Sequence, residues 1–126
     1  MAFLPDADRE YLDAKGIVFE EIEDGSTKGV ILKERPLPDG CFDAGAVDVL
    51  ILLPAGYPDA APNMFYLLPW VKLTSNGQYP RKANKPVTFA GKSWQRWSRH
   101  NSEWRPGIDG IWTMLKRIVD ALEKAA

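Results

Sequence analysis

The residues best suited to chemistry lie close together near the end of the chain, within residues 94–107. This stretch holds three of the five tryptophans, three arginines and the single histidine, His100, with Ser98 and Arg99 directly before it. A serine acts as a nucleophile when a base takes its proton and positive groups stabilise the oxyanion. The pattern therefore indicates a candidate catalytic site with Ser98 as nucleophile, His100 as base and Arg99 as electrostatic support. Ser93 is the second choice of hydroxyl.

A structural interpretation of the same stretch remains open. Residues two positions apart point to opposite sides of a strand and do not face each other on a helix, so a pairing of Ser98 with His100 requires an irregular loop. Tryptophans usually serve packing. Trp94, Trp97 and Trp104 would then pack this loop on a sheet, and the hydroxyl and imidazole would hold it by hydrogen bonds.

The single cysteine, Cys41, excludes an internal disulfide and a zinc site built from several cysteines. A reactive thiol needs electropositive surroundings, whereas Asp39 and Asp43 flank this one. The first ten residues lack the basic and apolar regions of a signal peptide, and the longest apolar run, 49–55, is too short to span a membrane. We therefore expect a cytoplasmic protein with no membrane partner, no metal and no cofactor.

Charge divides the chain into two unlike parts. Residues 1–71 contain thirteen acids and five bases, a net charge of −8, whereas residues 72–126 contain eleven bases and four acids, a net charge of +7. This division suggests a positive face that meets an acidic partner, although the two parts could instead pack together and neutralise each other. The residues to which we assign partner binding are Arg81, Lys82, Lys85, Lys92, Trp94 and Trp97.

Length and composition fit one α+β domain, 1–126, because a chain with 45% hydrophobic residues can bury a sizeable core. A short helix is expected at residues 6–12, with Gly16 after its end. Four antiparallel strands with turn residues at their ends are expected next, the third being buried on both faces. Residues 69–91 are interpreted as a long irregular connection. The expected strands are residues 17–22, 28–33, 46–53 and 63–68.

The final element has the most regular pattern in the chain. Its apolar residues recur at helical spacing, which predicts one amphipathic helix over 108–124, entered through Pro106 and Gly107. The acidic residue near its start and the basic residues further along suit the helix dipole. The expected apolar stripe consists of Ile108, Ile111, Trp112, Leu115, Ile118, Val119 and Leu122.

Three motifs, taken in order along the chain, carry a family resemblance. Tyr57-Pro58 follows the third expected strand, Pro62 closes the turn, and Trp104-x-Pro106 precedes the last helix. This order resembles the ubiquitin-conjugating E2 superfamily over residues 17–125. The Trp-x-x-Trp-Ser-Arg-His segment looks most like the prokaryotic E2-like family E. The resemblance implies an E2/UBC-like fold and, as partners, a ubiquitin-like protein and an E1-like activating enzyme.

The chain departs from that superfamily at the catalytic position. A classical E2 keeps its cysteine in the loop after the fourth strand, with a His-Pro-Asn motif upstream, and neither is present in this chain. Cys41 precedes the third expected strand instead. The resemblance therefore implies either acyl transfer through an oxyester on Ser98 or a non-catalytic E2 variant that binds its partners. Nucleic-acid binding is a weaker third class, because the pI of about 5.8 is acidic and no nucleic-acid-binding motif is present.

Overall fold

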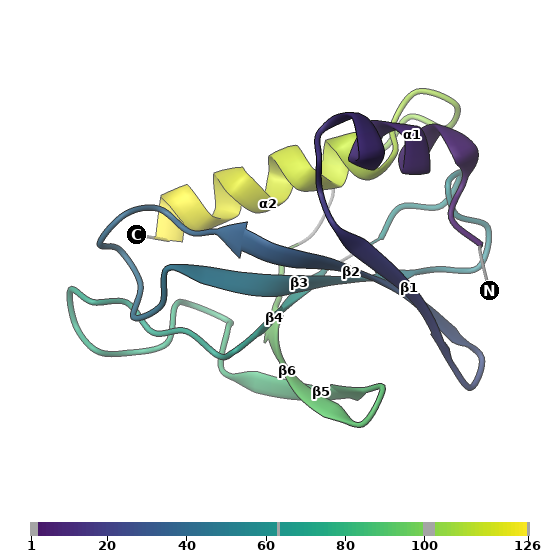
Figure 1. Cartoon of the computed structure of the whole chain (residues 1–126). Coiled ribbons are helices and arrows are strands. Elements are labelled where there is room, and N and C mark those ends of the chain that lie inside the picture. Colours follow the sequence, from purple (N-terminus) through teal and green to yellow (C-terminus); the bar gives the residue numbers. More distant parts are fainter. Residues whose placement is uncertain (1–2, 63, 100–102, 126) are drawn as a thin grey trace.

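The computed structural model describes residues 3–62, 64–99 and 103–125. Within them, two helices lie on one side of a curled antiparallel sheet, which confirms the α+β class (Figure 1). The elements are α1 (Asp6–Ala14), β1 (Phe19–Asp24), β2 (Thr27–Pro36), β3 (Ala46–Leu53), β4 (Phe65–Leu68), β5 (Lys85–Phe89), β6 (Lys92–Trp97) and α2 (Ile111–Ala125).

The first four strands form the expected meander, and the sheet order is β1-β2-β3-β4-β6-β5. β3 lies between β2 and β4, and it places Val49 and Ile51 on one face and Leu50 on the other, all buried. This confirms the prediction that the third strand is buried on both faces. The apolar run of this strand reflects two cores, because successive side chains of a strand point to opposite faces.

The prediction of a single irregular connection after β4 was wrong, because two further strands follow that strand. β5 lies within residues 69–91, and β6 begins just after them and contains the first residues of the candidate site. β6 pairs with β4 on one side and β5 on the other. The alternation of a strand is hidden here because β6 is buried on both faces, with Trp94 in one core and Trp97 in the other.

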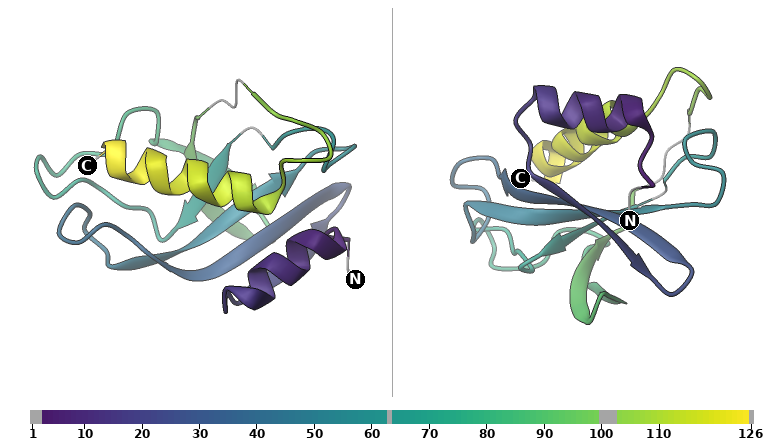
Figure 2. Two further views of the ribbon diagram at one scale, coloured as in Figure 1. Left: turned by 90° about the horizontal axis from the view of Figure 1, so that it is seen from above. Right: turned by 45° about the vertical axis from the view of Figure 1, so that its right-hand side comes forward.

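Two apolar cores lie on the two faces of the sheet. The larger core is covered by α1 and α2, and Figure 2 shows both helices on that side. The smaller core contains Ile31, Leu50, Tyr66, Phe89 and Trp94, under the β5–β6 hairpin on the opposite side. The hairpin can pack closely because of a glycine: a Cβ atom on Gly29 would come within 2.7 Å of the Phe89 ring. The small core thus depends on a residue without a side chain.

The last helix begins later than expected, at Ile111 instead of residue 108. Residues 106–108 form a turn, which leaves Ile108 57% exposed. The side chain of Asp109 holds this turn by accepting the backbone N–H of Arg105 at 2.8 Å and the hydroxyl of Thr113 at 3.0 Å. The bond from Thr113 ties this turn to the first turn of α2.

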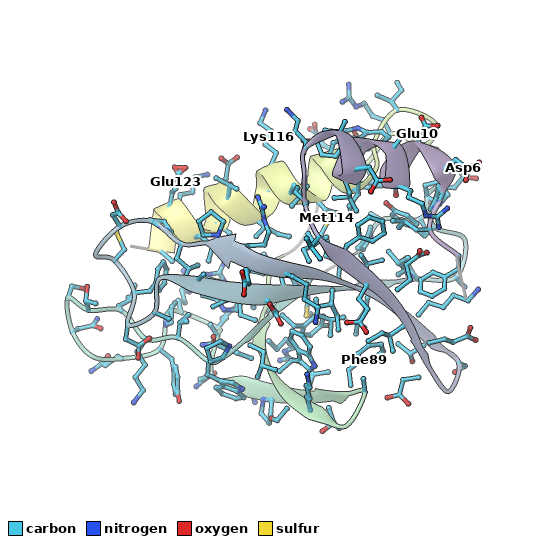
Figure 3. The ribbon with its side chains drawn as sticks, viewed as in Figure 1. Asp6, Glu10, Phe89, Met114, Lys116 and Glu123 are labelled. Carbon is cyan, nitrogen blue, oxygen red and sulfur yellow. The ribbon has the colours of Figure 1, made fainter. Side chains whose placement is uncertain are left out.

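The stripe predicted for this helix is only partly correct. Ile111, Leu115, Ile118 and Leu122 are buried as expected, and Met114 also points toward the sheet (Figure 3). Trp112 is half-buried against Tyr11 of α1, with ring centroids 5.9 Å apart. Val119 is 47% exposed, which was not expected. The residues that differ from the prediction lie at the border of the apolar face, where helical spacing alone does not decide burial.

Candidate functional site

Ser98 and Arg99 follow directly after β6, outside any regular element. The backbone N–H of Ser98 donates to the carbonyl of Lys82 at 3.1 Å. The Arg99 guanidinium donates through Nη1 to the carbonyls of Arg81 at 3.1 Å and Ser98 at 3.0 Å, and it lies 5.1 Å from the centroid of the Trp97 ring. These contacts fix the loop before β5 against the end of β6. They bring two predicted catalytic residues and two predicted partner-binding residues together.

The four residues line a pocket of about 780 Å³ between this loop, the end of β6 and one face of α2. Five cationic side chains and one carboxylate surround it, so the pocket is strongly basic. The Arg99 guanidinium is partly buried within this group of cations. Burial, with the Arg81 charge nearby, lowers the pKa of Arg99. The complete lining is Leu73, Arg81, Lys82, Ser98, Arg99, Arg117, Asp120, Ala121, Lys124 and Ala125.

Ser98 is half-buried, and it lines the pocket beside positive charge. Guanidinium groups beside a reacting carbonyl stabilise the negative charge that develops on its oxygen. His100, the predicted base, lies outside the described residues. Among the described residues the site thus brings the hydroxyl-bearing Ser98 together with the cationic Arg81 and Arg99.

The other predicted site residues do not join this pocket. Ser93 is exposed within β6, where it pairs with Thr88, and its carbonyl accepts the indole N–H of Trp70 at 3.1 Å. Lys85 and Lys92 are exposed on the β5–β6 hairpin and do not line the pocket. Only part of the predicted positive face therefore gathers at Ser98.

The role predicted for two tryptophans must be corrected. Trp94 is 1% exposed and Trp97 is fully buried, so neither side chain is available to contact a partner. Trp97 stacks on Phe65 with ring centroids 5.4 Å apart, and Trp94 donates its indole N–H to the carbonyl of Phe89. Their physical role is packing, in agreement with the structural interpretation of this stretch.

Gln95 is a supporting residue that the sequence analysis missed. It is fully buried, and its amide accepts the N–H of Val71 at 3.0 Å and donates to the carbonyls of Val71 at 3.0 Å and Ala83 at 2.7 Å. These bonds hold both ends of the connection between β4 and β5, which carries Arg81 and Lys82. The available signal was a glutamine between two tryptophans. Such a glutamine is expected to be buried with them, and a buried amide needs hydrogen-bond partners.

Two further pocket residues, Arg117 and Lys124, were also missed. They lie seven positions apart on α2, with Asp120 and Ala121 between them on the same face. Positions separated by three, four and seven residues share a helix face. The spacing of these residues could have indicated a surface site on the polar face of α2. The sequence analysis related the basic residues of this helix only to its dipole.

The motifs that carry the family resemblance contact one another. The Tyr57 hydroxyl donates to the carboxylate of Asp8, which also accepts the N–H of Ile111 at the start of α2. Trp104 donates its indole N–H to the carbonyl of Pro58 at 2.8 Å, and its ring centroid lies 6.4 Å from that of Tyr57. Burial raises the pKa of Asp8, and burial together with Asp8 raises the pKa of Tyr57. Through these contacts, the turn after β3 holds in place Trp104 and the start of α2.

Cys41 lies outside the pocket lining, in the loop before β3. Its thiol donates to the carbonyl of Asp39 at 3.5 Å, a local contact within a turn. Within residues 3–62, 64–99 and 103–125, no group of three or more His, Cys, Asp or Glu side chains could hold a metal ion. In the same part of the chain, no helix is long and apolar enough to cross a membrane.

The helix-covered antiparallel sheet, with a tyrosine-proline turn packed against the tryptophan before the last helix, defines the class as E2-like. The family model described as Prokaryotic E2 family E matches residues 4–125. The chain therefore belongs to this family of prokaryotic E2-like proteins, and it lacks the cysteine at the usual catalytic position. No curated protein and no solved structure matches the chain significantly.

Proposed function

We propose that this E2-like protein accepts a ubiquitin-like protein delivered by an E1-like enzyme, and that Ser98 carries the transferred acyl group as an oxyester. One observation carries the proposal: Ser98 lines the basic pocket at the end of β6, together with Arg81 and Arg99. This position is six residues before Trp104, in the interval where the E2 resemblance places the catalytic residue.

The proposed step begins from the thioester that joins the E1-like enzyme to the C terminus of the ubiquitin-like protein. The Ser98 oxygen attacks the thioester carbonyl, a C–O bond forms, and the negative charge on the carbonyl oxygen is stabilised by Arg99 and Arg81. The C–S bond then breaks, and the sulfur leaves as the thiolate of the E1-like enzyme. The hydroxyl proton passes to a base, for which His100 is the proposed residue.

A second candidate is a non-catalytic module that binds and positions the same partners. It is favoured by the burial of Trp94, Gln95 and Trp97, because these residues give the segment before Ser98 a structural role that needs no chemistry. In this alternative the basic pocket holds the tail of the ubiquitin-like protein without forming a bond to it.

Intact-protein mass spectrometry separates the two candidates. The protein is incubated with ATP and with the E1-like enzyme and ubiquitin-like protein from its own source. An oxyester adds the mass of the ubiquitin-like protein less one water, survives thiol and is cleaved by hydroxylamine or mild base. A binding module gives no covalent adduct but still co-elutes with the ubiquitin-like protein in size-exclusion chromatography.

A further inference from the structure

Half of the residues that line the basic pocket belong to α2. The face of α2 that borders it carries Arg117, Asp120, Ala121, Lys124 and Ala125, and the last lies eight positions after the first. At about 1.5 Å per residue this face is about 12 Å long. An extended peptide advances about 3.3 Å per residue, so the face matches about four residues of extended chain.

Within the part of the chain that the structure describes, the cations of this surface form no salt bridges. Arg81, Lys82, Arg99, Arg117 and Lys124 line the pocket, and none of the salt bridges among the described residues involves any of them. Among the described residues of the lining, Asp120 is the only one with a carboxylate side chain. Cations gathered in this way attract a chain of opposite charge.

Arg117 adds an unsatisfied donor to this surface. Its Nη2 donates to the carbonyl of Glu103 and its guanidinium lies 5.7 Å from the centroid of the Trp104 ring, which fixes the group. Its Nη1 is buried and has no hydrogen-bond partner among the described residues. A buried donor without a partner is unfavourable, and a carboxylate that reaches it would form a charge-assisted bond.

We propose that the tail delivered to Ser98 is acidic, with carboxylate side chains within about four residues of its reactive end. The inference rests on the proposed function, because it assigns the chemistry of the tail that enters the same pocket. The terminal carboxylate of the tail is consumed when the ester forms, so the cations must be matched by side-chain carboxylates. Leu73, Ala121 and Ala125 form an apolar wall that suits an apolar side chain between them.

The lining favours a peptide over a nucleic acid. Single-stranded nucleic acids bind to surfaces that combine cations with exposed aromatic rings on which bases stack. Among the described residues, no aromatic side chain lines this pocket, and the Trp97 ring beneath Arg99 is fully buried. The pocket thus supplies charge and small apolar side chains, which suit an extended acidic peptide.

Fluorescence polarisation with synthetic peptides tests the inference without acyl transfer. The probe is a labelled, C-terminally amidated hexapeptide, Ser-Asp-Leu-Glu-Ala-Gly, and its isostere with Asn and Gln in place of the two acids is the comparison. We expect the acidic peptide to bind at least about tenfold more tightly than the isostere, and its affinity to fall as salt rises from about 50 to about 300 mM.

Variants place the binding in this pocket. Arg81→Gln and Lys124→Gln should each weaken binding of the acidic peptide at least about threefold, because each removes one cation of the lining. Lys28→Gln is the matched control, since Lys28 is exposed outside the pocket and its replacement should leave affinity unchanged. Thermal melting of each variant confirms that the fold is retained.

Equal binding of the two peptides, no binding of either, or an equal loss with Lys28→Gln would overturn the inference. Tighter binding of a labelled single-stranded oligonucleotide at the same pocket would also overturn it. The proposed function can fail independently of this inference. If the acidic peptide is preferred but no oxyester forms, the protein is a binding module that is specific for an acidic tail. An oxyester without that preference leaves the acyl transfer and removes the acidic tail.

Discussion

Replacement of Gln95 by methionine should weaken the fold and disturb the basic pocket at the same time. The side chain keeps its approximate length, but the amide that binds Val71 and Ala83 is lost. Val71 and Ala83 are both fully buried, so three backbone groups lose their partner without access to water. Each such group costs about 1–3 kcal/mol. Because the loop can relax, we take the low end for each group and expect a loss of about 3 kcal/mol.

Urea denaturation followed by tryptophan fluorescence measures this loss, and for a chain of this length it corresponds to a fall in Tm of about 10 °C. Gln78→Met is the matched control, because Gln78 lies in the same connection and is exposed, so its replacement should change stability by less than about 0.5 kcal/mol. If Gln95→Met unfolds at the same urea concentration as the parent protein, the three hydrogen bonds do not hold this loop.

Three further predictions concern the core, the cysteine and the acid stability. Leu115→Ala should cost about 2–5 kcal/mol in denaturant unfolding, whereas Val119→Ala, at a half-exposed position, should cost less than about 1 kcal/mol; equal effects would contradict the described packing. Cys41→Ser should leave the fold and any covalent adduct unchanged in mass spectrometry, and loss of adduct would move the nucleophile to the thiol. Hydrogen bonds from Arg105 lower the pKa of Asp109 to about 2 from its usual 3.8. The ionised Asp109 carboxylate therefore stabilises the folded state fully above about pH 4, and this stabilisation is lost as the pH falls toward 2. Asp109→Asn should be less stable than the parent protein at neutral pH, and the two should have similar melting temperatures in acid.

The meander and the helices could be predicted because each presents a local pattern. The third strand combines β-branched residues with clear turn residues, and the buried positions 111, 115, 118 and 122 recur at helical spacing. The start of α2 could not be read from this periodicity. It depends on the side chains of Asp8 and Asp109, and Asp8 is distant in the sequence.

The β5–β6 hairpin was missed for a different reason. Both faces of β6 are buried, so its alternation does not appear as a change between apolar and polar residues. Its fit against the sheet depends on the absence of a side chain at Gly29, a long-range effect. The pocket was predicted in part, because Ser98 and Arg99 were chosen from the chemistry of their side chains. The contribution of Arg117 depends on how α2 lies across the sheet, which local patterns do not give.

The most direct test of the central claim is the mass of the intact protein after reaction with ATP, the E1-like enzyme and the ubiquitin-like protein, measured for four forms of the chain. We expect the parent protein and Ser93→Ala to carry a hydroxylamine-sensitive adduct and Ser98→Ala to carry none. His100→Ala should form the adduct about 10²–10⁴ times more slowly if the imidazole is the base. A normal adduct on Ser98→Ala, with the fold retained, would contradict the assignment of Ser98 as the acceptor.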